Sequence, residues 1–411
     1  MSLVQAPSPG DGLARNRLAE RLGAAVASVD PLVTPAFVVD LDAFDANADD
    51  LTRRSSGTPI RVASKSLRVP ALISRALAHP GFSGVLAYTV AEALWLEEHD
   101  LSDDVVVAYP SVDRGALAAL VASPRAASRI TLMVDDPAHL DVVDSVRHSH
   151  AVPVRVAIDV DAGLRMAGQQ VGPKRSPLFD ASAVVSLART IAARPGFRLV
   201  GVMTYEGQVA GVPDDVPGQR ARSTVVRQIK QRSIAQLAER RAEIARGLAQ
   251  VAEIEFWNAG GSGSLESSAA DPVVTEVTAG SGLLVPGLFD HYRAFTPRPA
   301  AFFGLPVTRI PGPGVVTVHG GGLIASGPTG ADRSPLPWAP AGLKLTGLEG
   351  AGEVQTPLTG NGTTRLRIGD LVWFRHAKSG ELFEHGNQVH LVRGDEVVDT
   401  VPTYRGEGLA F

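Results

Sequence analysis

The sequence predicts an α/β protein: a (β/α)8 TIM-type barrel followed by a C-terminal all-β domain. Eight short β-rich runs alternate with helical patterns between residues 60 and 277, and long helical patterns stop after about Pro297. Strands that alternate with helices indicate parallel βα units. An open doubly wound sheet is the alternative closure. The count of eight favours the barrel, and the absence of a Gly-x-Gly-x-x-Gly motif after the first strand weakens a dinucleotide-binding interpretation.

The elements follow from local hydrophobic periodicity. After a Pro/Gly/Ser-rich tail (1–12), the residues Leu18, Leu22 and Val26 fall near one face of a helix expected over 11–29. An extended run at 36–41 and a helical stretch to Leu51 come next. The expected barrel strands are 60–63, 84–87, 105–109, 130–134, 154–159, 199–204, 254–257 and 273–277, and the expected helices between them include 69–78, 91–98, 137–147, 181–193 and 223–250.

The expected domain organisation has three parts. A tail and helix occupy 1–30, the barrel occupies 31–297, and the β domain occupies 298–411. The last part is rich in Gly, Pro, Thr and Val, with turn residues between short runs. Its expected strands are 315–318, 343–345, 371–374, 389–392 and 396–400.

Composition excludes several classes of protein. The 411 residues carry 39 basic and 43 acidic side chains, and this net charge of −4 argues against a nucleic-acid-binding protein. The absence of Cys excludes disulfides, thiolate metal sites and a Cys nucleophile, and it fits a reducing compartment. No apolar run is long enough to span a membrane, and the tail lacks the pattern of a signal peptide. We therefore expect a cytoplasmic protein.

Lys65 is the most informative residue, because it comes just past the first barrel strand, at the mouth where barrel enzymes place functional groups. A lysine there can form a Schiff base with a carbonyl compound; a surface lysine that ends a strand is the alternative. Gly260, Gly261 and Ser262 follow the seventh strand, and Gly280 and Ser281 follow the eighth. Glycine-rich loops at these two positions are typical of phosphate sites in barrels.

Further candidates follow strands five and six. Arg165 lies in a segment that begins at Asp159, where it can contact an anionic ring oxygen or a carboxylate, or pair with an Asp to hold the loop. Tyr205 can hydrogen-bond a cofactor or simply pack at the rim, and Glu206 can act as a base or an orienting group.

In the β domain, His376 and His385 are weak candidates for a metal site, with Glu381 or Glu384 supplying oxygen. A solvated loop is the alternative.

Together these segments resemble the D-threonine aldolase/D-serine dehydratase-like family, which is related to alanine racemase and has the fold-type III pyridoxal-phosphate architecture. The resemblance extends from about Thr34 to Gly406. It rests on the order and spacing of Thr34–Asp42, Arg61 and Lys65, Thr89–Ala93, Asp159, Gly163 and Arg165, Tyr205–Gly207, Gly260–Ser262, Glu276, Gly280 and Ser281, Phe289 and Asp290, Gly369 and Asp370, and Arg405 and Gly406.

The resemblance implies that Lys65 holds pyridoxal 5'-phosphate and that Arg165 and Tyr205 lie by its ring. It also implies that Gly260, Gly261, Ser262, Gly280 and Ser281 bind the phosphate, and that the protein is a homodimer. The sequence departs from the family at several positions. The places two residues before and after the lysine, where the family often has His, hold Ala63 and Leu67. The Tyr that follows Gly-Ser in the family is Gly282 here.

The family's metal site pairs a His with a Cys or Asp two residues on, whereas this chain has His376 and Lys378. We therefore commit to no metal ligand, with His376 as the weak candidate.

The expected function is a pyridoxal-phosphate-dependent lyase that acts on a small, D-configured amino acid by aldol cleavage or dehydration of a β-hydroxy amino acid. The main alternative is an amino-acid racemase of the alanine type, which needs a second base opposite Lys65. A non-catalytic pyridoxal-phosphate-binding regulator and a sugar-phosphate barrel enzyme that uses Lys65 without a cofactor are the remaining hypotheses.

Overall fold

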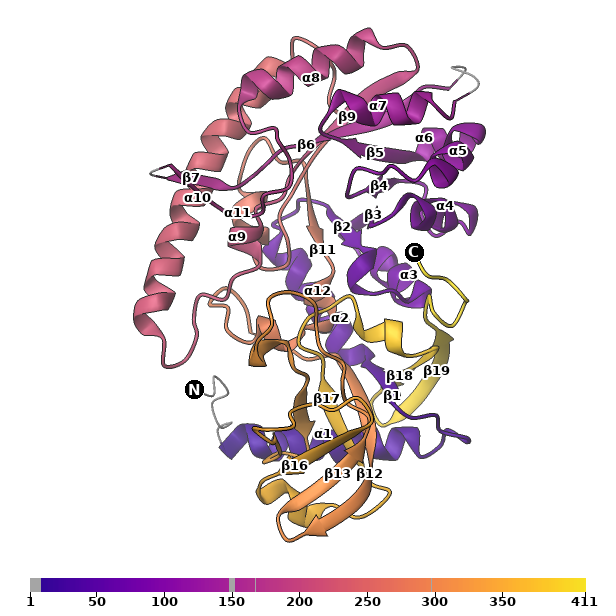
Figure 1. The fold of residues 1–411 in the computed structure, drawn as a ribbon, viewed down its shortest axis with the longest axis vertical. Helices are drawn as coiled ribbons and strands as arrows, with labels where there is room; N and C mark the ends of the chain where they lie inside the picture. Colours follow the sequence, from indigo (N-terminus) through magenta and orange to yellow (C-terminus); the bar gives the residue numbers. More distant parts are fainter. Residues whose placement is uncertain (1–8, 148–151, 167, 297) are drawn as a thin grey trace.

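The protein consists of a parallel β-barrel surrounded by helices and a second, mostly antiparallel sheet below it in the view of Figure 1. The barrel is closed, with the strand order β10-β11-β2-β3-β4-β5-β6-β9. The predicted eight-stranded βα barrel is thus confirmed. The residues that the computed structural model describes are 9–147, 152–166, 168–296 and 298–411.

All eight expected runs form the barrel strands. The last two, β10 and β11, begin at Phe256 and Glu276, slightly later than the hydrophobic runs suggested, because the strands include the polar Asn258 and Thr278, which hydrogen-bond each other. The barrel strands are β2 (Ile60–Ala63), β3 (Phe82–Ala87), β4 (Val105–Val107), β5 (Ile130–Val134), β6 (Val154–Asp159), β9 (Phe197–Thr204), β10 (Phe256–Ala259) and β11 (Glu276–Ala279).

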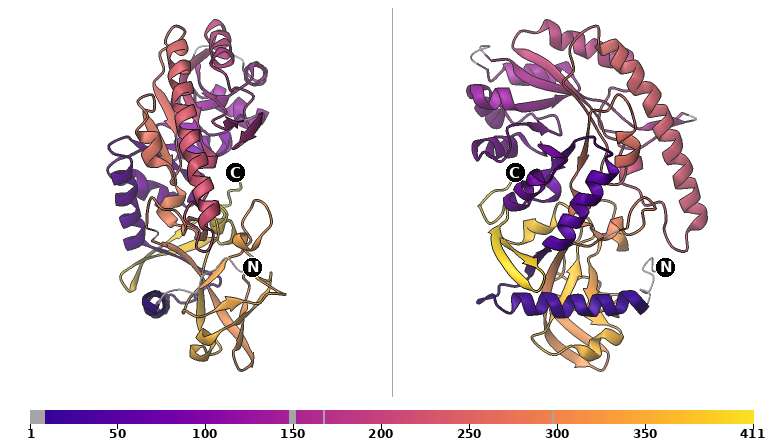
Figure 2. Two further views of the ribbon diagram at one scale, coloured as in Figure 1. Left: turned by 90° about the vertical axis from the view of Figure 1, so that its left-hand side faces the viewer. Right: turned by 180° about the vertical axis from the view of Figure 1, so that it is seen from behind.

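Helices cover the outside of the barrel, and the longest, α10, runs along one side of it (Figure 2). None of the described helices is both long and apolar enough to cross a membrane. The helices of this part are α2 (Leu41–Arg54), α3 (Pro70–Ala78), α4 (Val90–Glu98), α5 (Arg114–Ala122), α6 (Pro124–Arg129), α7 (Pro137–Asp144), α8 (Ala181–Ala193), α9 (Gly207–Ala210), α10 (Arg220–Leu248), α11 (Leu265–Ala269) and α12 (Ser281–Leu284). A small hairpin, β7 (Leu164–Met166) with β8 (Gln169–Val171), was not anticipated.

Side chains fill the barrel interior. The ring of Phe256 lies against Gly201, where a Cβ would come within 2.2 Å of it. Val106, Met133 and Val200 are buried in the same cluster. The interior is therefore a packed core rather than a channel.

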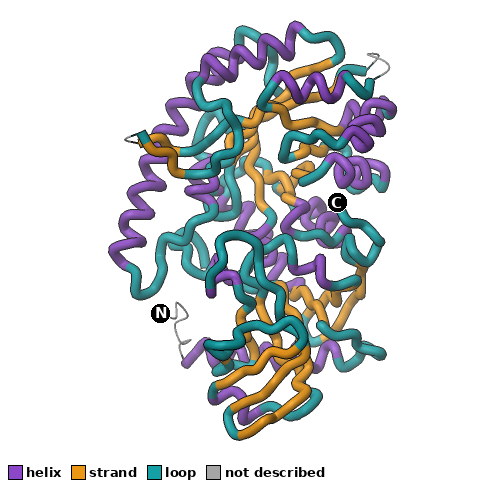
Figure 3. Tube along the Cα trace, in the orientation of Figure 1, coloured by secondary structure: helices purple, strands orange, loops and turns teal. Residues whose placement is uncertain are grey.

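The second sheet contains nine strands (Figure 3). Its main path is β15-β16-β13-β12-β1-β18-β19, while β17 pairs with β12 and β14. The strands β12, β14 and β16 were not anticipated, since each contains Pro, which usually marks breaks in strands. The strands are β1 (Ala36–Asp40), β12 (Ala301–Gly312), β13 (Val315–His319), β14 (Leu336–Ala339), β15 (Lys344–Leu345), β16 (Gln355–Thr359), β17 (Leu371–Arg375), β18 (Gln388–Arg393) and β19 (Glu396–Pro402).

The N-terminal elements belong with this second sheet. Strand β1 pairs antiparallel with β12 and parallel with β18. Helix α1 (Pro9–Val26) packs Leu22 and Val26 into a core cluster with Phe302 and Trp373. The proposed division at residue 31 would assign β1 to the barrel, but its hydrogen bonds join it to the C-terminal segment. Its short run of apolar residues does not reveal which sheet it joins.

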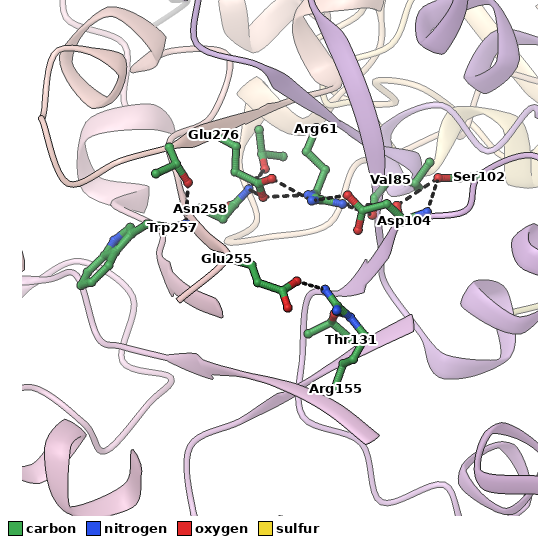
Figure 4. A network of polar contacts seen from close by, with 12 residues as sticks. Arg61, Val85, Ser102, Asp104, Thr131, Arg155, Glu255, Trp257, Asn258 and Glu276 are labelled. Carbon is green, nitrogen blue, oxygen red and sulfur yellow. Dashed lines mark hydrogen bonds and ion pairs between the residues drawn. The ribbon is translucent and has the colours of Figure 1, made fainter. Parts of the chain in front are cut away.

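A buried ion pair crosses the base of the barrel, at the N-terminal ends of its strands (Figure 4). The Arg61 side chain of β2 donates to both carboxylate oxygens of Glu276 in β11, at 2.7 Å each, and to Asp104 Oδ2 at 2.8 Å. Burial alone would lower the pKa of Arg61, but the two carboxylates outweigh it and raise that pKa. The contacts of Arg61 therefore hold β2, β11 and the segment before β4 together.

We predict that Arg61→Met destabilises the protein strongly, because it leaves the buried Glu276 carboxylate without its partner. The expected loss in the free energy of unfolding is about 3–5 kcal/mol, measured by urea unfolding. The control is Arg155→Met, which breaks the more exposed pair with Glu255 at the same end of the barrel. We expect it to cost about 1 kcal/mol or less. Equal losses in the two variants would contradict this assignment.

Candidate active site

Lys65 lies directly after β2, in the short turn η1 (Ser64–Ser66), at the C-terminal end of the barrel. Ser64 Oγ donates to the carbonyl of Leu86 in β3 at 3.1 Å and so holds the turn to the neighbouring strand. The neighbours of Lys65 in the turn are buried, whereas Lys65 itself is exposed. Its amine donates a hydrogen bond to the phenol oxygen of Tyr109, at 2.7 Å. The turn therefore directs a nucleophilic amine into the barrel mouth.

Tyr109 was not among the residues singled out from the sequence. It was counted as the last residue of the third barrel strand, but that strand, β4, ends at Val107 and Tyr109 lies two residues past it. The usable signal is a polar aromatic side chain at the C-terminal end of a barrel strand, which is where barrel enzymes carry functional groups.

The loop after β11 packs directly on the Lys65 turn. A Cβ on Gly280 would lie 2.6 Å from the carbonyl oxygen of Ala63, so only glycine fits there. Next to it, the hydroxyls of Ser281 and Ser66 are 3.1 Å apart and share a hydrogen bond. The loop after β11 therefore lies against the turn that carries Lys65.

The loop after β10 meets the loop after β11. Gly260 has a φ of +79°, a conformation that favours glycine. The N–H of Gly261 donates to Ser264 Oγ at 3.2 Å, and the N–H of Gly282 donates to Ser262 Oγ at 2.9 Å. Backbone N–H groups and hydroxyls from two loops thus converge and hydrogen-bond one another; groups of this kind bind phosphate in other proteins.

Tyr205, just after β9, borders the same loop. A Cβ on Gly261 would lie 3.3 Å from the Cε2 atom of the Tyr205 ring. Burial and the nearby Glu206 raise the pKa of Tyr205 to about 12. Its hydroxyl therefore stays protonated at neutral pH, so it can donate a hydrogen bond.

Glu206 acts as an orienting group for the glycine loop in this structure. Its carboxylate accepts hydrogen bonds from Ser264 Oγ at 2.8 Å, from the N–H of Gly260 at 3.2 Å and from Ser268 Oγ. Arg241 of α10 adds an ion pair at 3.3 Å. With these partners the carboxylate holds the loop in place.

Arg165 does not join this group of residues. It lies in β7, its backbone pairs with the side chain of Gln236 in α10, and its guanidinium lies 3.6 Å from the centroid of the Phe179 ring. Arg240 also stacks on Phe179, at 3.7 Å. The role of Arg165 beside a cofactor ring stays a prediction. It does not pair with Asp161 either, whose carboxylate instead accepts from the N–H of Gly163.

Arg175 is a second residue that the sequence analysis missed. Burial raises the pKa of Asp159 to about 7 and also raises that of Tyr205, and the positive charge of Arg175 opposes both shifts. A guanidinium therefore acts electrostatically on the ends of β6 and β9, from the loop before α8. Nothing in its sequence context sets it apart from other surface arginines.

The second sheet contributes one loop to the site, the segment between β17 and β18. A Cβ on Gly380 would lie 3.0 Å from the carbonyl oxygen of Lys65. Glu384, in the same loop, forms an ion pair with Arg68 at 2.5 Å. The loop therefore lies over the Lys65 turn, and both parts of the protein complete the mouth.

The donor set in this loop does not fit a divalent metal ion. His376 is buried, its Nε2 lies 3.1 Å from Ser379 Oγ, and burial together with Arg375 lowers its pKa to about 3. Lys378, the second position of the family pair, donates to Ser326 Oγ at 2.9 Å.

The proposed oxygen ligands are also engaged elsewhere: Glu381 accepts from the N–H of Ser326 at 2.8 Å, and Glu384 pairs with Arg68. In the described ranges, no three His, Asp or Glu side chains form a group that could hold a metal.

Known proteins resemble the chain in sequence and in fold. It is 28% identical to a D-threonine aldolase of an Arthrobacter species over 63% of each chain. It is 24% identical to 3-hydroxy-D-aspartate aldolase of Paracoccus denitrificans, over 60% of this chain and 59% of that protein. The chain thus matches less than two thirds of the length of these curated relatives. The crystal structure of D-threonine aldolase from Filomicrobium marinum superposes with a TM-score of 0.75 at 20% identity, covering 92% of this chain and 96% of that one.

A family model agrees with these relatives. The model described as alanine racemase, N-terminal domain, matches residues 39–285, more than half of the sequence. This range contains all eight barrel strands, the Lys65 turn and both glycine loops. The chain therefore belongs to the family of proteins with an alanine racemase N-terminal domain.

Proposed function

We propose that the protein is a pyridoxal-phosphate-dependent enzyme that cleaves or dehydrates a small β-hydroxy amino acid, of D configuration. The observation that supports the proposal is the contact between the Lys65 turn and the glycine loop at Gly280, because an amine and a candidate phosphate-binding loop then lie side by side. The names of the curated relatives, aldolases for D-threonine and 3-hydroxy-D-aspartate, support the substrate class.

Each group of residues at the barrel mouth has its own role in the proposed reaction. Bound pyridoxal phosphate supplies an electron sink that stabilises negative charge at the α-carbon of an amino acid. Lys65 holds the cofactor through Nζ and, when that nitrogen is released, takes up or returns a proton there. The loops at Gly261 and Ser281 bind the phosphate, and Tyr205 borders the ring. The packed barrel core below excludes water from beneath the site.

The proposal that Lys65 holds the cofactor can be tested by chemical trapping. The purified protein should show the visible absorption band of lysine-bound pyridoxal phosphate, and borohydride reduction followed by peptide mapping should label Lys65. Lys65→Ala should abolish the band and reduce turnover by several orders of magnitude, because no amine remains to hold the cofactor. Lys344→Ala, which alters an exposed lysine of the second sheet, serves as the control.

Labelling of a different lysine would disprove the assignment of Lys65. A panel of D- and L-amino acids then separates the reactions. Aldehyde or ammonia release from D-β-hydroxy amino acids supports a lyase, whereas interconversion of enantiomers supports the racemase alternative. A stable band with no turnover of any amino acid would indicate a binding protein.

Gly261→Val tests the phosphate site. A Cβ at Gly261 would already lie 3.0 Å from Ala210 Cβ, so a branched side chain crowds the N–H groups of the loop. Overpacking of this kind costs about 1–3 kcal/mol, and we expect a roughly 10- to 100-fold loss in affinity for pyridoxal phosphate. Gly312→Val, at a glycine with open space around it, should bind like the unmodified protein. Unchanged affinity in a folded Gly261→Val variant would exclude this loop.

We further predict that activity survives metal chelation, because the ammonium of Lys378 lies in the place of a metal ligand and His376 is bonded to Ser379. A fixed positive charge can replace that of an ion near a substrate hydroxyl. Turnover of a D-β-hydroxy amino acid is measured before and after EDTA treatment, and again after addition of Mn²⁺, Mg²⁺ or Zn²⁺. Loss on chelation with recovery on one metal would refute the prediction and indicate His376 as a ligand.

A further inference from the structure

The shortest polar contact of the Lys65 amine is with Tyr109. Lys65 Nζ lies 2.7 Å from the phenol oxygen and 5.3 Å from the centroid of the ring. The ring is partly buried, whereas the lysine is exposed. This is a charge-assisted hydrogen bond in which the ammonium donates to the phenol oxygen.

The backbone fixes the position of Tyr109. The N–H of Ala108 donates to the carbonyl of Ala87 at 2.8 Å, which continues the pairing of β3 and β4 past the end of the strand. Pro110 follows, and a residue before proline is restricted to extended conformations. Tyr109 therefore lies in a bend two residues past β4 whose backbone is tied to β3, and its hydroxyl is held near Lys65.

Several charged groups surround the pair. Burial lowers the pKa of Lys378; Glu381 opposes this shift, and the positive charge of Lys65 adds to it. Tyr109 also acts electrostatically on Lys378 and on Tyr205. The Lys65–Tyr109 pair therefore lies near a second ammonium group, that of Lys378.

We propose that Tyr109 is a catalytic residue that exchanges one proton with Lys65. The proposal rests on the function of Lys65 as the lysine that holds the cofactor. An amine attacks a carbonyl carbon only when its nitrogen carries a free electron pair. In the pair that has lost one proton, an Nζ–H bond of the ammonium breaks and an Oη–H bond forms on the phenolate, which gives a neutral amine and a neutral phenol with no change in total charge.

The matched chemistry of the two groups makes this transfer easy. A phenol and a primary amine are weak acids of similar strength, and the two atoms are only 2.7 Å apart, so the proton has a short path between them. Tyr109 returns the proton to Nζ over the same hydrogen bond when Lys65 becomes an ammonium again. Tyr109 thus gives Lys65 a proton partner that does not depend on the substrate.

The test compares Tyr109→Phe with a matched control, Tyr88→Phe. Tyr88 directly follows β3 at the same end of the barrel, and its ring lies over Arg68. Both variants lose a phenol hydroxyl and keep the ring. The first measurement is the rate at which cofactor-free protein captures pyridoxal phosphate as a function of pH. Tyr109→Phe should be slower at neutral pH by at least about tenfold, because no phenol oxygen remains to exchange a proton with the amine.

A second measurement shows whether the site is intact. Pyridoxamine phosphate has no aldehyde and binds without a bond to lysine, so its affinity should stay within about twofold in both variants. Tyr88→Phe should capture pyridoxal phosphate at the unmodified rate. Capture by Tyr109→Phe at the unmodified rate, with an unchanged pH profile, would overturn the proposal while leaving the role of Lys65 intact.

A third measurement separates this proposal from the proposed function. Competitive acetylation of cofactor-free protein over a range of pH, read out on the Lys65 peptide, reports the titration of that amine directly. Tyr109→Phe should move its midpoint to lower pH, because the ammonium loses the hydrogen bond that stabilises it. If capture occurs on another lysine, the proposed function fails, and an unmoved Lys65 midpoint then refutes the Tyr109–Lys65 pair as well.

Discussion

The buried ion pair between Arg61 and Glu276 is the constraint on which the site depends. It joins β2 to β11, the two strands between which the chain closes the barrel on itself. Asp104 extends the contact toward β4. Buried charges are costly unless they are paired, so the alternatives in which these strands slip or separate are strongly disfavoured. Lys65 comes four residues after Arg61, in the turn that directly follows the same short strand, and the base of the barrel thereby fixes the position of the amine at its mouth.

The segment that follows the Lys65 turn is held in place by the C-terminal part of the chain. The N–H of Tyr404 donates to the carbonyl of Arg68, just after the Lys65 turn, and its hydroxyl donates to the carboxylate of Glu92. Burial raises the pKa of Glu92 to about 7, and the hydrogen bonds it accepts from Tyr404 and from the N–H of Tyr88 oppose that shift. Tyr404 thus fixes the backbone next to the Lys65 turn. The C-terminal part of the chain therefore helps to build the site.

Sequence periodicity predicted the barrel well, because each of its strands is a short apolar run between helical patterns. It could not assign Ala36–Asp40 to a sheet, since partners such as β12 and β18 lie more than 250 residues away. The glycine loops were predictable because close backbone approach requires glycine. The orientation of the Arg165 side chain could not be predicted. Its guanidinium stacks on Phe179, and spacing along the chain carries no information about that contact. Tyr109 was missed for a similar reason, since only the fold places it beside Lys65.

The electrostatics of the mouth are set by which charges are already paired. The carboxylates nearest the loops are held by donors: Glu206 by hydroxyls, a backbone N–H and an arginine, and Glu381 by the N–H of Ser326. The cations Lys65 and Lys378 donate to neutral oxygens instead, a phenol and a serine hydroxyl. Positive charge at the mouth is thus less fully compensated than negative charge. Cations that no carboxylate pairs attract anionic groups, which agrees with the pyridoxal-phosphate function proposed for this site.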